Sequence, residues 1–428
     1  MGVVAIKLNV KVHLCGDFFA IIRAFICRIP PMELAPLYLK KNEERRLRNG
    51  HLWVYSNEVD IGRSPLTGFE PGQQVVMVAN DGKAIGSGYV NPHSLIAGRL
   101  VSRTAKQVLD RSLLVHRLNI ALSLRERLFN KPFYRLVYGE SDGLPGLVVD
   151  RYGDVLVAQV NTAGMEAVLD EIVEALDKVL KPLAILWRND SGAREQEGLD
   201  SYVKPALGEV PETVLIEENG TRFEVPLLSG QKTGWFYDHR MNRARVQQLA
   251  KGLRVLDVFS YIGGWGIEAA TAGAKEVICI DSSARALDSV ARNAELNKMN
   301  DRVSSIEGDA FEALKALRAE REVFDLVIVD PPAFIKRKKD AKKGIEGYQR
   351  INTAAMQLLG KDGLLVSASC SYHLQANSLR DLLSRSSRHL DRTMQILEQG
   401  HQGPDHPIHP AIPETEYIKC LTSRVVML

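Results

Sequence analysis

The sequence predicts an α/β protein whose C-terminal part is a doubly wound, Rossmann-like parallel sheet, preceded by a small β-barrel and a central α+β domain. Three observations predict this. Apolar runs alternate with helical stretches from about residue 229 onward, several of these runs end in an aspartate, and residues 34–104 form short, β-rich segments punctuated by glycine. A chain of 428 residues is expected to contain two or three domains.

The composition is that of a soluble globular protein, with 45% hydrophobic and 25% charged residues. The net charge of +3 does not by itself indicate a nucleic-acid partner. The five scattered cysteines form no CxxC pair and no metal-ligand pattern, which predicts a reducing compartment and a cytoplasmic protein without a metal site. No run of about 20 apolar residues occurs, so neither a transmembrane helix nor a membrane partner is expected.

Residues 1–31 differ from the rest of the chain. Their apolar stretch is interrupted by Arg23 and followed by Arg28, and no small-residue cleavage site comes after it. These features argue against a signal peptide. We expect an upstream extension, with Met32 as the usual start of the protein.

Residues 32–106 are predicted to form the small β-barrel. A basic helical turn leads into the apolar Trp53-Val54-Tyr55, and a Pro71-Gly72 turn precedes the next strand. Further strands are expected at 82–91 and 96–102, with glycines every few residues. The pattern resembles a PUA domain, an RNA-binding pseudo-barrel, although any small β-barrel would also fit it.

Residues 107–228 are predicted to be the central α+β domain. The expected elements are a helix over 108–130, two strands around a Gly/Pro/Asp turn within 134–160, a helix near 165–180 and a strand ending in Trp187. Asn219-Gly220 is a strong signal for a two-residue turn, and it predicts a hairpin over 213–226.

Residues 229–428 are predicted to hold the parallel sheet. Its strands are expected at 253–259, 276–281, 303–309, 324–330 and 363–369. The last two apolar segments, 393–399 and 417–426, are expected to form an antiparallel edge hairpin. In such a sheet, ligands gather beyond the carboxyl ends of the strands.

The loop after the first of these strands distinguishes between two nucleotide-like cofactors. It runs from Asp257 to Gly266 and does not have the G-x-G-x-x-G spacing of a dinucleotide site. An acid at this strand end would repel a pyrophosphate but suits an ammonium group. Asp281 is placed to accept from ribose hydroxyls and Asp309 from an adenine amino group. Each acid, taken alone, is more often a helix N-cap or turn residue, but four of them at successive strand ends, with Asp330 as the fourth, favour a binding role.

Several ordered segments carry a family resemblance. They include GQKTGWFYDHRMNR, DVFSYIGGWGIEAATAGA, DSSARALDSVARNAELN, DPPAF and HPAIPETEYIK, together with GESDGLPGLVVDRYGD in the central part. These segments resemble the large-subunit (23S) rRNA 5-methylcytosine methyltransferase I family of class I S-adenosylmethionine-dependent methyltransferases. With the PUA-like start, the resemblance covers nearly all of residues 32–428.

The resemblance implies S-adenosylmethionine as the cofactor and a set of residues that bind it. Those residues are Gln231, Lys232, Thr233, Asp238, Arg240, Asp257, Phe259, Tyr261, Gly263, Gly264, Asp281, Asp309 and Asp330. Lys232 and Arg240 could meet the cofactor carboxylate, or could instead be solvated or RNA-facing charges.

A thiol and an acidic turn lie at two neighbouring strand ends and indicate the chemistry. Carbon 5 of cytosine becomes nucleophilic once a thiolate has added at carbon 6, and Cys370 is the cysteine at a strand end. Cys279 and Cys420 are expected in the core. Asp330 would hold the cytosine edge, and Pro331 with Pro332 would stiffen its turn.

Two alternatives remain open. Acidic-Pro-Pro turns also serve methylation of guanine or adenine amino groups, which needs no thiol, and a non-catalytic RNA-binding assembly factor could keep the same fold. Many RNA 5-methylcytosine enzymes have a second cysteine where this chain has Pro332. That departure leaves the proton-removing base unassigned.

The expected partner is large-subunit rRNA, and the oligomeric state, with a homodimer among the options, is left open. The predicted RNA contacts are Pro331, Pro332, Lys336, Arg337, Lys338, Lys339, Lys342, Lys343, Arg45 and Arg46. Phe334 and Tyr348 are either stacking partners of a base or core residues. His401, His406 and His409 are expected to be loop residues.

Overall fold

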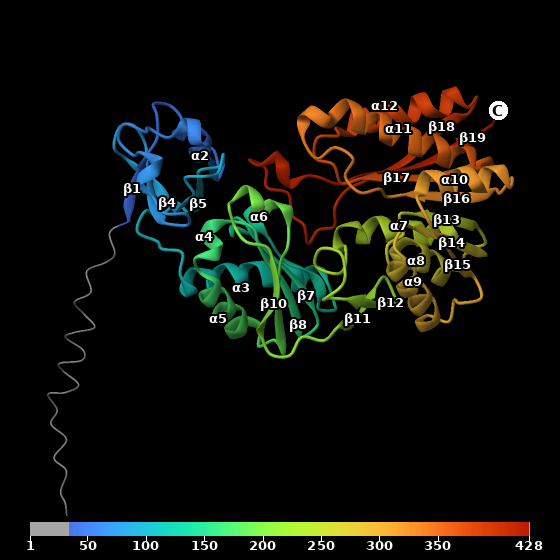
Figure 1. Cartoon of the computed structure of the whole chain (residues 1–428), viewed down its shortest axis with the longest axis horizontal. Helices are drawn as coiled ribbons and strands as arrows, with labels where there is room; N and C mark the ends of the chain where they lie inside the picture. The colour runs from blue at the N-terminus through green and yellow to red at the C-terminus, as the bar shows by residue number, and fades with distance from the viewer. Residues whose placement is uncertain (1–33, 428) are drawn as a thin grey trace, which may run out of the picture.

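The computed structural model describes residues 34–427 (Figure 1). The expectation for residues 1–31 concerns a segment outside this range. Figure 1 shows a small N-terminal sheet, a central α/β part and a large C-terminal sheet following one another along the longest axis. Among the helices of residues 34–427, none combines the length and apolar character that a membrane span requires.

The N-terminal part is a five-stranded sheet of order β1-β3-β4-β5-β2. Its elements are β1 (Ala35–Tyr38), α2 (Glu44–Arg48), β2 (Trp53–Val54), β3 (Gln74–Val78), β4 (Ala84–Val90) and β5 (Gly98–Ser102). The glycine punctuation has a physical cause, because a Cβ at Gly86 or Gly88 of β4 would collide with the backbone of β5.

The central part is a second five-stranded sheet, of order β10-β9-β8-β7-β6. Its elements are α3 (Arg111–Leu128), β6 (Phe133–Tyr138), β7 (Leu147–Tyr152), β8 (Val155–Val160), α4 (Ala163–Glu166), α5 (Leu169–Leu180), β9 (Ala184–Asn189), α6 (Gly192–Gln196) and β10 (Tyr202–Leu207). The segment 134–160 contains parts of three strands rather than the expected two. A turn at Gly153, with φ of +67°, separates β7 from β8.

The predicted hairpin is confirmed as β11 (Thr213–Glu218) and β12 (Thr221–Pro226). Asn219 and Gly220 form its turn with φ values of +51° and +80°. Positive φ at both central residues is the requirement of a type I′ turn, which Asn-Gly satisfies at low cost.

The C-terminal part confirms the doubly wound sheet. Its order is β15-β14-β13-β16-β17-β19-β18. The elements are α7 (Arg240–Ala250), β13 (Arg254–Val258), α8 (Gly264–Thr271), β14 (Glu276–Asp281), α9 (Ala284–Leu296), β15 (Val303–Glu307), α10 (Ala310–Ala319), β16 (Phe324–Val329), α11 (Ala341–Gln357), β17 (Leu359–Ser369), α12 (Ala376–His389), β18 (Thr393–Gly400) and β19 (Lys419–Val426).

The strand order reverses between β13 and β16, so the point where ligands gather lies at the carboxyl ends of these two strands. Strands β13 to β17 are parallel, and β19 runs antiparallel to β17 and β18. Helices α7 to α9 cover one face of the sheet and α10 to α12 the other (Figure 1).

The last two strands pair antiparallel at the sheet edge, as expected, but no tight turn joins them. Residues 401–418 connect β18 to β19 and reach from the large sheet to the other two parts (Figure 1). In this connection the Asp405 carbonyl accepts from Arg125 of α3, and Ala411 lies beside Gly50. The three parts of the chain therefore meet around residues 401–418.

Candidate active site

A cavity of about 330 Å³ lies beyond the carboxyl ends of β13, β14, β16 and β17. Segment 231–243, the loop after β13, the turn after β16 and the end of β17 form its wall. The residues that line it are Gln231, Lys232, Trp235, Phe236, Asp238, His239, Arg243, Phe259, Ser260, Tyr261, Gly264, Trp265, Asp281, Ser282, Asp330, Pro331, Pro332, Ala333, Cys370 and Ile418.

The cavity brings together the two residues to which the sequence assigns the chemistry, Asp330 and Cys370. The Trp265 indole Nε1 donates to Oδ2 of Asp330 at 3.1 Å, and His239 Nε2 lies 3.5 Å from its Oδ1. The Asn242 amide nitrogen donates to the other imidazole nitrogen of His239 at 3.0 Å. This bond leaves the proton of a neutral imidazole on Nε2, facing Asp330.

The Cys370 thiol is a weak acid in this setting. Burial raises its pKa to about 11, the Lys232 ammonium lowers it, and the carboxylates of Asp330 and Asp238 raise it further. The thiol is therefore protonated at neutral pH in the protein alone. Of the other two cysteines in the described range, Cys279 and Cys420 are both buried in the core, as predicted.

A buried hydroxyl network fixes the backbone on both sides of Cys370. The Ser369 hydroxyl donates to the Tyr348 hydroxyl at 2.9 Å, and the Ser371 and Tyr348 hydroxyls lie 2.8 Å apart. The Lys419 ammonium donates to the Ser371 carbonyl at 2.9 Å. Tyr348 is fully buried, so it is a core residue rather than a stacking partner of a base.

The loop after β13 is held in an unusual conformation. Phe259 and Tyr261 have φ values of +66° and +51°, which are strained for aromatic residues. The Tyr261 hydroxyl donates to the Gly234 carbonyl at 3.0 Å and accepts from the Gln231 amide at 2.9 Å. The Tyr261 amide donates to Asp281 at 2.9 Å. These bonds tie segment 231–234 to the β13 loop at the cavity mouth.

Asp257 and Gly263 lie behind this loop and do not line the cavity. Asp257 is fully buried and its Oδ2 accepts from the Gly266 amide at 2.9 Å. Burial raises the pKa of Asp257 to about 7, against the lowering effect of that amide. Gly263, with φ of +85°, precedes α8, and a Cβ there would crowd Ile267. Both residues shape the loop from beneath.

Two further acids at strand ends, Asp281 and Asp309, have different positions relative to the cavity. Asp281 lines the cavity. Asp309 is exposed, lies outside the lining and caps α10 by accepting from the Phe311 amide at 2.9 Å. This is the N-cap placement that the sequence offered as its alternative.

Segment 231–240 places three of its five predicted residues on the cavity. Gln231, Lys232 and Asp238 line it. Thr233 is buried and lines a neighbouring cavity. The buried Arg240 guanidinium instead pairs with Glu218 at 3.1 Å, so it lies away from the position where it could meet a cofactor carboxylate.

Asp238 presents an unsatisfied acceptor. Its Oδ2 accepts from the Tyr417 hydroxyl at 2.6 Å, whereas its buried Oδ1 has no hydrogen-bond partner. Burial alone would raise the pKa of Asp238, but His239, His406 and Lys232 hold it well below its usual range. A carboxylate of this kind can receive a cationic or donor group.

The predicted RNA-contact residues fall into three groups: the two prolines of the cavity wall, the basic residues that follow them, and two arginines of the N-terminal part. Pro331 and Pro332 line the cavity. The six basic residues Lys336, Arg337, Lys338, Lys339, Lys342 and Lys343 are exposed. On the N-terminal sheet, Arg45 is exposed, whereas Arg46 pairs with Glu58 at 2.8 Å.

Sequence reasoning missed His239, Trp265 and Arg243 as wall residues. His239 and Arg243 lie inside a segment that carries the family resemblance, but no spacing rule identified them. The positions of His239 and Arg243 depend on how segment 235–243 packs over the sheet.

Comparisons with known proteins agree with this geometry. A model of S-adenosylmethionine-dependent methyltransferases matches residues 187–412, and a PUA-like domain model matches residues 37–103. Proteins named ribosomal RNA large subunit methyltransferase I are similar over almost their whole length. The relative from Aliivibrio fischeri (strain MJ11) is 37% identical, covering 91% of this chain and 99% of that protein. The relative from Shewanella frigidimarina is also 37% identical, covering 90% and 98%.

Solved structures show the same fold. A methyltransferase crystallised with SAH has a TM-score of 0.79 at 21% identity, covering 91% of this chain and all of that one. A methyltransferase structure from Streptococcus mutans has a TM-score of 0.77 at 22% identity, with the same coverage. The resemblance stated from the sequence is confirmed. The chain belongs to the S-adenosylmethionine-dependent methyltransferases, in the family whose members are named ribosomal RNA large subunit methyltransferase I.

Proposed function

We propose that the protein methylates carbon 5 of a cytosine in large-subunit rRNA, with Cys370 as the covalent nucleophile. One observation carries the proposal: a thiol and a braced carboxylate, Cys370 and Asp330, line the same cavity as the residues that fit S-adenosylmethionine. The names of the relatives support rRNA as the substrate.

The cavity residues fit the cofactor. The buried, unpartnered Oδ1 of Asp238 suits the ammonium group of its methionine part, and Asp281 suits ribose hydroxyls. Phe259 and Tyr261 add aromatic surface to the lining. When bound, S-adenosylmethionine supplies a methyl group on a sulfonium centre, which carbon nucleophiles can attack.

Cys370 supplies the electrons that the cytosine ring lacks. Its thiolate adds to carbon 6, the carbon 5–carbon 6 double bond opens, and carbon 5 becomes nucleophilic. After carbon 5 carries the methyl group, a base removes its proton. The electron pair of that bond restores the double bond and expels the Cys370 thiolate, so that the enzyme is regenerated. The high pKa of the free thiol means that substrate binding must favour the thiolate.

Asp330 orients the base in this scheme. Its carboxylate can accept from the cytosine amino group, while the Trp265 indole holds Oδ2 in place and the His239 ring lies 3.5 Å from Oδ1 without a hydrogen bond to it. Pro331 restricts the backbone directly after it, which keeps the carboxylate aimed at the cavity. Its contribution is positioning of the ring against Cys370.

Methylation of a guanine or adenine amino group would need the acidic turn but no thiol. The lining of the cavity by Cys370 favours carbon 5 of cytosine over these alternatives. A non-catalytic assembly factor would have no use for a thiol at this position.

The decisive variant is Cys370→Ala, assayed with large-subunit rRNA and labelled S-adenosylmethionine. We expect methylation to be lost while cofactor affinity is kept. Cys420→Ala, a buried cysteine outside the cavity lining, is the matched control and should remain active. Undiminished methylation by Cys370→Ala would overturn the mechanism, and methylation of an amino group in the product would overturn the assigned position.

We also propose the domain division 32–106, 107–228 and 229–428, and a cytoplasmic location. The PUA-like match at 37–103 lies inside the first domain. The methyltransferase match begins at residue 187, inside the central sheet, so limited proteolysis between 207 and 231 would test the second boundary.

A further inference from the structure

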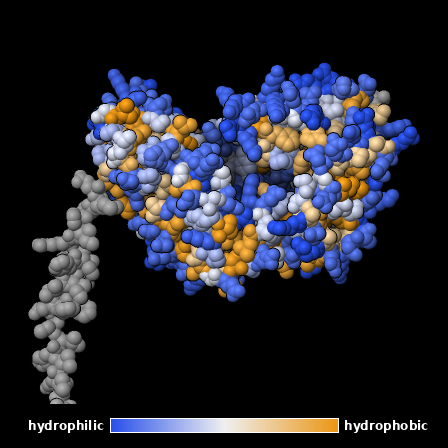
Figure 2. Space-filling model, viewed as in Figure 1, coloured by the Kyte–Doolittle hydropathy of each residue, from blue (hydrophilic) through white to orange (hydrophobic). Residues whose placement is uncertain are grey.

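Three cavities follow one another through the middle of the protein. The active-site cavity adjoins a central cavity of about 570 Å³, because Lys232, Trp235, Phe236 and Asp238 line both. The central cavity in turn adjoins a junction cavity of about 740 Å³, because Tyr138 and Glu414 line both. Figure 2 shows the surface deeply hollowed between the C-terminal part and the rest of the molecule. A single strand of RNA could therefore contact all three cavities.

The junction cavity is built where the three parts of the chain meet. The N-terminal sheet contributes Trp53 and Tyr55, the central part contributes Glu140, and the 401–418 connection contributes Glu414. None of these residues has a place in the mechanism above.

The aromatic side chains of this cavity are held in place. The Trp53 indole Nε1 donates to Glu140 Oε1 at 2.9 Å, and this bond fixes the Trp53 ring. Trp53 does not bond to the other carboxylate oxygen of Glu140, Oε2. The Arg46 guanidinium lies 4.8 Å from the centre of the Tyr55 ring. A fixed aromatic face is suited to stacking of a nucleobase.

The polar groups indicate which part of a nucleotide enters. Carboxylates at Glu140 and Glu414 disfavour a phosphate, but a carboxylate can accept two N–H groups at once from the imino and amino edge of guanine. Arg99 also lines the cavity, is 7% exposed, and has an Nε without a hydrogen-bond partner. Its Nη1 pairs with the Glu197 carboxylate at 2.9 Å, which holds the guanidinium in the cavity wall, so the unpartnered Nε is the group that a guanine carbonyl could meet.

The cavity also lies close to the catalytic strand end. Tyr372 is two residues beyond Cys370. Burial raises the pKa of Tyr372, and the neighbouring Glu414 carboxylate and Tyr55 phenol act in the same direction. The loop that carries the thiol is therefore a neighbour of the junction cavity wall.

We propose that the junction cavity binds an unpaired guanine of the RNA substrate while the target cytosine occupies the active-site cavity. This inference rests on the proposed function, because it takes RNA as the substrate. Recognition of a guanine in the junction cavity would let the enzyme select its RNA sequence at a site other than the active-site cavity.

The test is an abasic scan of an RNA fragment that contains the target, with affinity for the full chain measured by fluorescence anisotropy. We expect one flanking guanine at which removal of the base weakens binding about tenfold, the size of one lost stacking contact. Replacing that guanine by inosine, which lacks the amino group, should weaken binding severalfold. In Trp53→Ala, the abasic effect at this position should shrink to less than twofold. Glu414→Gln, an exposed position, should remove the inosine effect but keep the abasic effect.

Equal sensitivity of Trp53→Ala and the wild type to the abasic position would overturn the inference, as would a scan without any sensitive flanking guanine. Such a scan is also the result expected if the cavity binds a peptide rather than RNA. Thermal unfolding and S-adenosylmethionine affinity verify that both variants fold. Because the readout is binding, it is independent of Cys370. A wild-type protein that methylates normally but shows no position-specific effect contradicts only this inference, whereas active Cys370→Ala contradicts only the proposed mechanism.

Discussion

The imidazole Nε2 of His239 lies 3.5 Å from Oδ1 of Asp330, and Trp265 donates to the other oxygen of the same carboxylate. His239 is itself oriented by Asn242. The carboxylate at the end of β16 is thus held by one hydrogen bond from Trp265, and the buried His239 imidazole lies beside its other oxygen without a hydrogen bond to it. A carboxylate held in this way can orient a base without first reorganising.

Trp265→Phe should lower the turnover number for methylation about tenfold or more. The change keeps an aromatic ring but removes the N–H donor to Asp330, and hydrogen bonds to charged groups contribute roughly 1.5–3 kcal/mol. Steady-state kinetics should show this loss in kcat, with the KM for S-adenosylmethionine changed less than about threefold. Trp187→Phe, a buried tryptophan of the central sheet, is the control and should keep its activity. An unchanged kcat in Trp265→Phe would show that the hydrogen bond from Trp265 to Asp330 does not contribute to catalysis.

Alkylation of Cys370 in the protein without RNA should become faster with pH up to about pH 11. The thiolate is the reactive form, and the pKa of Cys370 is about 11, so the rate should rise about tenfold per pH unit between pH 7 and pH 9. Mass spectrometry of the Cys370 peptide after timed iodoacetamide treatment measures this rate. A plateau below pH 9 would contradict the prediction. Lys232→Met should slow alkylation, since the ammonium of Lys232 lowers this pKa.

Asp257→Asn should stabilise the protein at pH 8. The folded-state pKa of Asp257, about 7, is above its ordinary value of 3.8, so its stabilising contribution is complete below pH 4 and is lost as pH rises to 7. The asparagine keeps an acceptor for the Gly266 amide without carrying a charge. Urea unfolding should show a gain of roughly 1–4 kcal/mol at pH 8 and little gain at pH 4.5. Stability profiles that run parallel between these pH values would contradict the assignment.

The fold was predictable wherever local pattern and burial agree. β14 and β16 lie within a residue of the predicted segments because apolar, β-branched runs buried on both faces are a strong local signal. The extra strand in 134–160 was missed because only Gly153 and Asp154 interrupt the apolar run of β7 and β8, although such a Gly-Asp pair is itself a hairpin signal. The route of residues 401–418 could not be predicted either, since it depends on contacts such as the one between Arg125 and Asp405, 280 positions apart.

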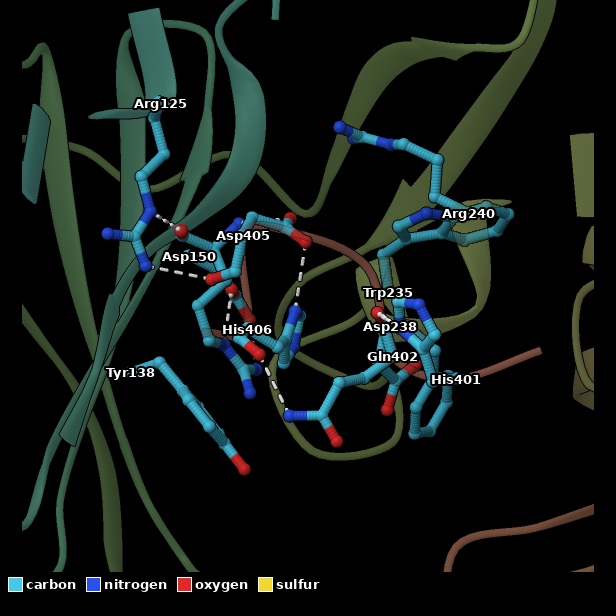
Figure 3. Close-up of polar contacts among 12 residues, drawn as sticks. Arg125, Tyr138, Asp150, Trp235, Asp238, Arg240, His401, Gln402, Asp405 and His406 are labelled. Carbon is cyan, nitrogen blue, oxygen red and sulfur yellow. Dashed lines mark hydrogen bonds and ion pairs between the residues drawn. The ribbon is translucent and has the colours of Figure 1, made fainter. Parts of the chain in front are cut away.

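Some residues of the candidate site could likewise be predicted from the sequence, and others could not. Cys370, Asp330 and Asp281 were found because the ends of parallel strands share one edge. His239 and Trp265 face Asp330 only after α7 and α8 have packed on the sheet, which no sequence spacing shows. His406 lies in the loop between β18 and β19, as expected, but the sequence did not show that it is buried there, 3.0 Å from the Asp405 carboxylate (Figure 3).

Arg125→Met should destabilise the protein by about 3–5 kcal/mol, because it leaves buried acceptors without their charged partner. The fully buried Arg125 guanidinium donates to both oxygens of Asp142 at 2.6 and 2.8 Å. It also donates to the Asp405 carbonyl at 2.8 Å (Figure 3). Urea unfolding measures the loss. The control is Arg111→Met, which breaks a half-exposed pair with Glu174 and should cost less than about 1 kcal/mol. Equal losses in the two variants would mean that Arg125 does not anchor the connection.

The double variant Lys338→Gln/Lys339→Gln should bind the rRNA fragment more weakly and with a shallower salt dependence. Both lysines are exposed in the segment between the Asp330 turn and α11, and within residues 34–427 neither forms an ion pair. Each lysine that contacts a phosphate of single-stranded RNA releases counterions, so losing two contacts should lower the slope of log Kd against log salt concentration by about 1.4. Anisotropy titrations at several salt concentrations measure this slope. Lys178→Gln/Lys181→Gln, at the end of α5, is matched in charge and should leave the slope unchanged. If both double variants changed the slope equally, the effect would reflect net charge, and the loop beside Asp330 would have no specific role in holding RNA.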